Sequence, residues 1–390
     1  MNKARIKSFF KANTMIIALI VITAFFVLET RGKILLAQNI SNLIAQNAYV
    51  FVLATGMLLC ILTGGNIDLS VGSVVCFVGA TGATLMENMN VHWVICVIFM
   101  LILGIIIGAW QGFWIAYVRV PPFITTLAGM LIFRGLSNVV LNGLTVSITN
   151  NTFVKVFGGG ADCYIPDFFG LEGFNLTAML TGVIACAIYL FIQIRGRLIR
   201  AKKGYELEPL QNMLMKAIVV SAAILAISYQ LSRHRGLPTV LIIVAIVVLV
   251  YAYITSKTTL GRYFYAVGGN EKATKLSGID TKKVYFLAYT NMGFLAALAG
   301  MITIARLTSA QPTYGQNYEM DAIGSCFIGG ASAYGGTGKV SGVIIGALLM
   351  GVINLGMSIM GVDANWQKVV KGGVLLAAVI FDVISKKKSA

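Results

Sequence analysis

Long apolar stretches separated by short polar segments run through the whole chain. A membrane core of roughly 30 Å is crossed by a helix of about 20 apolar residues, so such stretches are typical of transmembrane spans. Only 11% of the residues are charged, against about 25% in ordinary soluble proteins. We therefore predict an all-α, polytopic transmembrane bundle of about 10–12 spans, with residues 1–390 forming a single membrane domain.

The first apolar stretch follows a basic leader, as a signal peptide would. No small-residue cleavage pattern follows it, so we interpret it as the first transmembrane helix. The expected spans are residues 15–28, 43–63, 70–88, 92–118, 122–141, 177–194, 215–231, 238–256, 285–306, 339–360 and 367–385.

The formal net charge of +16 would favour nucleic acid binding in a soluble protein. Here the 30 Lys and Arg residues gather in a few short loops, which is the positive-inside pattern of membrane proteins. We predict a multi-pass protein of the plasma (cytoplasmic) membrane, with no nucleic acid partner. Both termini and the 195–216 and 257–283 loops are placed in the cytoplasm, and the 142–176 loop outside, where it could face an external partner.

Two glycine-rich segments interrupt the apolar pattern, at 64–72 and within 321–338. If the 257–283 loop and the C-terminus share one side, the second segment must cross the membrane only part-way, as a short helix and a break. Non-helical backbone at membrane depth is tolerated only against protein or a water-filled cavity. We predict broken or re-entrant segments that line a path. The sequence leaves open whether the two halves are true repeats.

The candidate path-lining residues are polar and lie in or beside these breaks: Asn66, Asp68, Ser70, Ser332 and Tyr334. A carboxylate at membrane depth is costly, so Asp68 should be paired or hydrated. Two roles remain open for Asp68: it caps the helix beginning near Ser70, which is favoured, or it lines the path. Gly104, Gly108 and Gly112 share one helix face and are predicted to serve close packing.

The 257–284 segment is polar, lies between two strong spans and contains helix-capping chemistry. Asn270 is predicted to begin a short helix that runs through Leu276, with Gly278 ending it and Ile279 packing back. A solvated basic loop is the simpler alternative. We favour a folded cytoplasmic docking element.

Several motifs of enzymes are missing. GGTGKVSG at 335–342 resembles a phosphate-binding loop, but Ala333 stands where its first glycine belongs and Val340 replaces the Ser or Thr. No GxSxG, HExxH or Cys and His set is found, and the six cysteines form no disulfide framework. The sequence therefore predicts a chain that is not an enzyme and has no catalytic residue, metal site or cofactor. The 307–320 loop, uncharged apart from Glu319 and rich in amides, hydroxyls and tyrosines, suits sugars.

Four motifs in order, TGGNIDLSVGS (63–73), VPPFITTLAGMLIFRGL (120–136), GRYFYAVGGNEKATKLSGI (261–279) and DAIGSCFIGGASAYGGTGKVSG (321–342), resemble the ribose, xylose and galactose permease family of ATP-binding-cassette (ABC) importers. The closing VVKGGVLLAAVIFD (369–382) agrees. The resemblance covers nearly the whole chain, and the extended middle is similar to xylose-type permeases.

This resemblance implies a permease subunit that forms the path for a monosaccharide, D-xylose first, with galactose, arabinose or multiple sugars as alternatives. It implies a second permease copy, a cytoplasmic ATP-binding subunit and an extracytoplasmic sugar-binding protein as partners, within a lipid membrane. A secondary transporter is the rival, although acids within the expected spans are few. The family's coupling element to the ATPase maps onto Gly261, Arg262, Gly268, Gly269, Asn270, Ala273 and Gly278.

Overall fold

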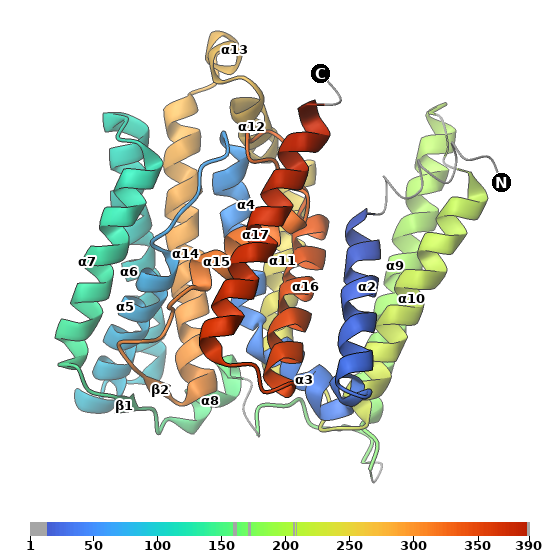
Figure 1. Ribbon diagram of the computed structural model, residues 1–390, viewed down its shortest axis with the longest axis horizontal. Coiled ribbons are helices and arrows are strands. Elements are labelled where there is room, and N and C mark those ends of the chain that lie inside the picture. The colour runs from blue at the N-terminus through green and yellow to red at the C-terminus, as the bar shows by residue number, and fades with distance from the viewer. Residues whose placement is uncertain (1–13, 159–161, 171–172, 206, 208, 388–390) are drawn as a thin grey trace.

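The computed structural model describes residues 14–158, 162–170, 173–205, 207 and 209–387. Within them the chain is almost entirely helical, as the apolar periodicity predicted. A single antiparallel pairing of two-residue strands, β1 (Val146–Ser147) with β2 (Ser309–Ala310), is the exception in the described part. The helices run side by side in a bundle (Figure 1).

Seven helices of the described chain are long and apolar enough to cross a membrane, and a bent helix pair, α3 with α4, makes a possible eighth. Each of the eleven predicted spans coincides with a helix or a helix pair. The seven are α6 (Trp93–Phe113, extended by a π-helical turn to Val118), α7 (Pro122–Leu141), α9 (Leu176–Lys202), α10 (Leu210–Ser232), α11 (Thr239–Lys257), α14 (Thr281–Leu307) and α16 (Val340–Ile359).

Three further predicted spans form helices that are shorter or less apolar. They are α2 (Thr14–Glu29), α5 (Val71–Ala83, with a π-helical turn to Asn88) and α17 (Ala364–Lys387). The remaining helical segments are short: η1 (Lys33–Leu35), α8 (Asn151–Phe157), α12 (Thr259–Gly269), α13 (Glu271–Leu276) and α15 (Tyr318–Ile328).

The predicted span 43–63 is not one straight helix. It is divided into α3 (Ala37–Gln46) and α4 (Ala48–Leu62), which are bent by 41°. The bend lies at Asn47, whose side-chain amide donates to the Leu43 carbonyl at 2.7 Å. An amide so close to the backbone competes with the helical ladder, which explains a break that hydropathy alone does not show. The α9 helix also runs to Lys202, well past the predicted end at residue 194.

The core of the bundle is α14, which packs on α4, α5 and α6. Tyr289, Met292 and Leu295 on this helix are fully buried. A Cβ built on Gly104 would lie 2.5 Å from the Gly293 carbonyl oxygen, so α6 and α14 approach backbone to backbone. The prediction that the glycine face of 104–112 serves close packing is confirmed.

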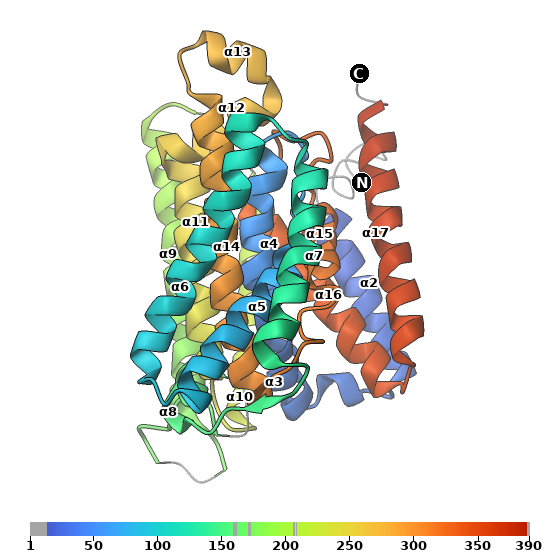
Figure 2. The same cartoon turned by 90° about the vertical axis from the view of Figure 1, so that its left-hand side faces the viewer.

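Figures 1 and 2 show how the ends of the helices are distributed. The start of α2, the end of α9, the α12–α13 unit and the end of α17 share one end of the bundle, called here the α13 end. The opposite end holds α3 and α8. The basic stretches predicted to be cytoplasmic, as far as they are described, thus gather at a single end.

Candidate functional site

The first break, residues 63–70, connects the end of α4 to the start of α5 without regular structure. Gly64 and Gly65 have φ of 126° and 76°, which L side chains rarely adopt. The chain therefore turns back on itself at the α13 end and descends beside the bundle core before α5 begins. As predicted, a non-helical segment lies against protein.

Asp68 is the centre of a buried hydrogen-bond chain at this break. Its Oδ1 accepts from the backbone N–H of Ser70 at 2.8 Å and from the Ser70 hydroxyl at 2.6 Å. The Ser70 hydroxyl in turn accepts from the side-chain amide of Gln111 on α6 at 2.7 Å. The Asp68 carboxylate thus accepts a backbone N–H directly before α5. Through Ser70 and Gln111 it also connects the beginning of α5 to α6.

The second break, residues 329–339, lies between the half-length helix α15 and α16. At 1.5 Å per residue, the eleven residues of α15 extend about 16 Å, roughly half of a membrane core. The glycine-rich loop is closed by the bonds Ser332 N–H to Thr337 O at 2.9 Å and Gly335 N–H to Ser332 O at 3.0 Å. The sequence prediction of a short helix followed by a glycine-rich break is confirmed.

The two breaks meet at what we call the glycine junction, formed by residues 62–65, 268–269 and 333–336. A Cβ on Gly65 would lie 1.9 Å from the Ala333 carbonyl oxygen, and one on Gly335 would lie 2.4 Å from the Gly64 Cα. The Gly336 N–H donates to the Leu62 carbonyl at 3.0 Å. Glycines are needed here because three backbone segments are in direct contact.

The α12–α13 unit supplies the third segment of the glycine junction. A Cβ on Gly268, near the end of α12, would lie 1.7 Å from the Leu62 carbonyl oxygen and 2.5 Å from the Gly336 nitrogen. The Tyr265 hydroxyl donates to the Gly338 carbonyl at 2.8 Å. The α12 helix therefore contacts the end of α4 and the second break at once.

The short helix α13 has the caps predicted from the sequence. Asn270 Oδ1 accepts from the Ala273 N–H at 3.0 Å, and Gly278 ends the turn with φ of 83°. The Ile279 N–H closes the turn on the Thr274 carbonyl, and its side chain packs on the core. Leu276 at the tip is 90% exposed, and α13 projects beyond the rest of the bundle (Figures 1 and 2).

Glu271 fastens α13 to the bundle. Its carboxylate accepts from the Arg119 guanidinium at 2.8 Å, the Tyr285 hydroxyl at 3.1 Å and the Thr281 hydroxyl at 3.2 Å. Partial burial alone would raise the pKa of Glu271, but these hydrogen bonds and the Arg119 charge outweigh it and hold the pKa below its usual value.

The seven residues assigned to coupling have different structural positions. Gly261 allows α12 to approach α11, since a Cβ there would lie 2.2 Å from the Ile254 carbonyl oxygen. Asn270, Ala273 and Gly278 form the caps of α13, and Gly268 lies in the glycine junction. Arg262 and Gly269 are exposed, and a Cβ on Gly269 meets nothing within 4 Å. All seven thus belong to one continuous element at the α13 end.

The five candidate path residues are brought to neighbouring places in the two breaks but differ in exposure. Asp68, Ser70 and Ser332 are buried, Asn66 is part-buried and Tyr334 is 63% exposed. Asn66 donates to Thr63, and the Ser332 hydroxyl accepts from the Tyr334 N–H at 3.0 Å. Of these five side chains, only Asn66 and Tyr334 are therefore accessible at the protein surface in this conformation.

Two charged contacts were not predicted. Asp321 of α15 accepts from the Tyr49 hydroxyl at 2.7 Å and pairs with Lys371 of α17. Arg134 of α7 donates to the carbonyls of Pro312 and Tyr314, at 2.9 and 2.6 Å. It thereby holds the irregular 311–317 segment against α5, where a Cβ on Gly315 would lie 2.0 Å from the Gly72 carbonyl oxygen. Arg134 is the one charged residue of the expected span 122–141. A charge at membrane depth usually has a polar partner, so it was the sequence signal for this contact.

A family model described as "Branched-chain amino acid transport system / permease component" matches residues 39–379. The xylose transport system permease protein of Haemophilus influenzae is 40% identical over 374 residues, covering 96% of each chain. Its counterpart in Escherichia coli K12 is 36% identical, covering 96% of this chain and 92% of the relative.

The ribose import permease protein of Escherichia coli K12 is also similar. It is 34% identical over 376 residues, covering 96% of this chain and 95% of the relative. No solved structure matches the chain. The similarity to sugar permeases therefore extends through both breaks, the α12–α13 unit and the extended middle.

Proposed function

The chain belongs to the permease family identified by that model and, within it, to the ribose- and xylose-type ABC sugar permeases, and from this premise we propose that it forms the path by which D-xylose is imported. Permeases are the transport components of such systems rather than enzymes. Membership implies ATP-binding and sugar-binding partners. Xylose is proposed over ribose because the xylose permease relatives are the more similar, at 40% and 36% identity against 34%.

The ATP-binding subunit docks on the α12–α13 unit. This proposal is supported by Leu276, a large apolar side chain that is 90% exposed at the tip of a capped helix projecting from the bundle. Exposed Lys272 and Lys275 flank it on the same short helix. An apolar anchor surrounded by charges is typical of a helix that inserts into a groove of a partner.

Coupling then passes through the glycine junction. ATP can shift the equilibrium between permease conformations only if the ATPase interacts differently with each of them. Displacement of α13 moves α12, and α12 touches both the end of α4 and the second break through Gly268 and Tyr265. Both breaks are thereby moved by one element. This contact is the observation that carries the proposed mechanism.

The path residues remain Asn66, Asp68, Ser70, Ser332 and Tyr334, in the breaks that this mechanism moves. Burial of three of them is compatible with a closed path that opens when the breaks separate. A second copy of the chain completes the path, as the resemblance implies, and a sugar-binding protein docks at the end opposite α13. In this orientation the α13 end and both termini are cytoplasmic, which agrees with the basic residues gathered there.

Reconstitution tests the proposal. The permease is placed in proteoliposomes with its ATP-binding subunit and sugar-binding protein, and uptake of labelled xylose, ribose, galactose, arabinose and glucose is measured with and without ATP. We expect ATP-dependent uptake in which xylose is preferred. Preference for another of the sugars would replace xylose while keeping the importer. Accumulation without ATP would favour a secondary transporter, and failure of all five sugars would overturn the substrate class.

A further inference from the structure

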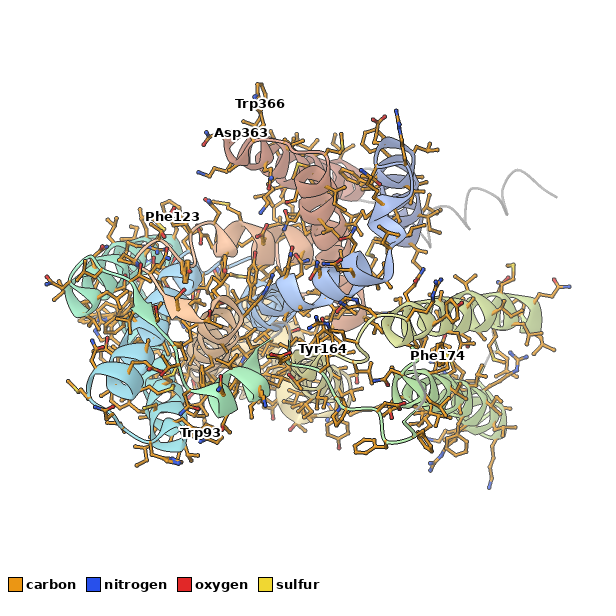
Figure 3. The ribbon with its side chains drawn as sticks, turned by 90° about the horizontal axis from the view of Figure 1, so that it is seen from below. Trp93, Phe123, Tyr164, Phe174, Asp363 and Trp366 are labelled. Carbon is orange, nitrogen blue, oxygen red and sulfur yellow. The ribbon has the colours of Figure 1, made fainter. Side chains whose placement is uncertain are left out.

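Helices α9 and α10 form a hairpin that stands apart from the rest of the bundle. In Figure 3, Phe174 marks this hairpin at one side, with Tyr164 between it and the helices around Trp93. The two helices pack on each other, with Gly182 against Ser228, and α10 packs on α3. Few residues in the most apolar stretch of each helix are buried within the protein: 17% of that stretch in α9 and 6% in α10.

The hairpin is fixed at the end opposite α13. Asn175 donates its backbone N–H to the Ser232 carbonyl at 2.9 Å, and the Ile165 N–H donates to the Leu237 carbonyl at 2.9 Å. The Tyr164 hydroxyl is 3.0 Å from the Ser41 hydroxyl of α3. The first two bonds close the base of the hairpin and its flanking loops, and the Tyr164 contact connects this base to α3. The opposite ends of the two helices diverge from the bundle (Figure 1).

The diverging end is strongly basic. About 20 residues of helix cross a membrane core, whereas α9 has 27 residues. A span that begins at Leu176 therefore leaves the core near Arg195, and the last turns lie at headgroup level. Arg195, Arg200, Lys202 and Lys203 in these turns are exposed. The whole 195–216 segment carries six Lys or Arg residues and two Glu residues, which leaves a net positive charge.

Apolar surface faces the membrane beside this basic end. Ile188, Phe191 and Ile192 of α9 are each more than half exposed. This exposed apolar face of α9, directly before the basic turns, is available to the acyl chains of a lipid.

We propose that the basic end of the α9–α10 hairpin binds the headgroup of an anionic phospholipid, whose acyl chains lie along the exposed apolar face of α9. The occupant follows from charge complementarity: four exposed cations at headgroup level repel one another unless anions neutralise them. Clusters of Lys and Arg next to a transmembrane helix attract anionic lipid in this way.

The test compares two lipids that differ only in the headgroup. Dioleoyl-phosphatidylglycerol and dioleoyl-phosphatidylcholine are titrated into the detergent-purified full-length protein, and bound lipid is counted by native mass spectrometry. The variant carries Arg195→Gln, Arg200→Gln, Lys202→Gln and Lys203→Gln. We expect the affinity of this variant for phosphatidylglycerol to fall at least ~10-fold relative to the wild type. Its affinity for phosphatidylcholine should stay within ~2-fold of the wild-type value.

A control variant removes the same charge elsewhere at the α13 end, through Lys272→Gln, Lys275→Gln, Lys282→Gln and Lys283→Gln. The affinity of this control variant for phosphatidylglycerol should stay within ~2-fold of the wild-type value. An equal loss in both variants, or no loss in the hairpin variant, would overturn the site. None of these measurements depends on sugar uptake, so they can fail independently of the proposed function.

Discussion

Lys371 of α17 places its ammonium nitrogen 3.0 Å from Asp321 Oδ1 on the half-length helix α15. The Asp321 side chain is 2% exposed and that of Lys371 18%, so the pair is largely shielded from solvent. The Tyr49 hydroxyl from α4 donates to the other carboxylate oxygen. Three helices distant in the sequence are thus joined through one carboxylate beside the second break.

Removal of one partner of this pair should be more harmful than removal of both. Lys371→Met leaves the buried Asp321 carboxylate without its cation, which typically costs about 3–5 kcal/mol. The double variant Asp321→Asn with Lys371→Met removes both charges and should recover much of that loss. Thermal unfolding of the purified protein in detergent measures the difference. Additive losses in the double variant would show that the two charges do not interact.

Gly268 and Gly269 form a matched pair of positions with opposite expectations. Gly268→Ala places a methyl group 1.7 Å from the Leu62 carbonyl oxygen, so backbone must shift, at a cost of about 1–3 kcal/mol. Gly269→Ala meets open space and should leave folding unchanged. The melting temperature and the membrane content of each variant check this.

A bulky residue at the exposed position separates coupling from folding. Gly269→Trp should leave membrane assembly intact but reduce ATP-driven uptake, because the added ring stands where the ATPase is proposed to dock. Normal sugar accumulation by this variant would contradict the assignment of Gly269 to the docking surface. For Gly268 the structure predicts that folding and uptake fall together.

The carboxylate of Asp68 should matter for the start of α5. Asp68→Ala leaves the Ser70 N–H and hydroxyl without their acceptor, at a cost of about 1–3 kcal/mol for a buried donor. Asp68→Asn retains an acceptor oxygen but loses the charge, so it should lie between the wild type and Asp68→Ala. Melting temperature and uptake rate are the measurements. If Asp68→Asn changes neither, both the structural and the path role of the charge are wrong.

Loss of the Asn270 cap should weaken the α12–α13 unit without affecting the bundle. Asn270→Ala removes the acceptor of the Ala273 N–H, which costs about 1 kcal/mol at a typical N-cap. Asn270→Asp preserves the cap and serves as the control. Hydrogen exchange of residues 271–276 should accelerate in the alanine variant alone. Equal exchange in all three proteins would show that the cap does not stabilise α13.

The ion pair of Glu271 with Arg119 predicts a pH dependence. Because the folded pKa of Glu271 lies below its usual value, its stabilisation is fully present above about pH 5 and is lost as pH falls through the folded pKa, below about pH 4. Glu271→Gln should therefore be less stable than the wild type at neutral pH and equally stable at low pH. A stability difference that persists at low pH would contradict the pairing.

Most of the fold was predictable because apolar length is a local signal. Each span was visible as a run of apolar residues, and the caps of α13 were visible because Asn270 and Gly278 act within a few residues of themselves. The bend at Asn47 was missed because Asn within a helix is ambiguous until its amide is seen to contact the Leu43 carbonyl. Hydropathy also did not show that α9 continues to Lys202.

Contacts between distant segments were not predictable. The sequence marked Asp68, but nothing in it joins Ser70 to Gln111, 41 positions away. Asp321 stands at the start of the second glycine-rich segment and Lys371 near the start of the last expected span, but their pairing depends on how α15 and α17 are packed. The glycines of both breaks were recognised as interruptions of the apolar pattern. Their direct contact with Gly268 depends on the tertiary arrangement.

The glycine junction has a mechanical consequence. An interface of side chains can absorb a small displacement when χ angles change, but backbone pressed against backbone has no rotamers to adjust. When α12 moves, the hydrogen bond from the Gly336 N–H to the Leu62 carbonyl either stays intact, so that both breaks move together, or breaks. The junction therefore passes even a small displacement of α12 to both breaks, and under the proposed coupling this is how a movement of the ATPase is transmitted to the path.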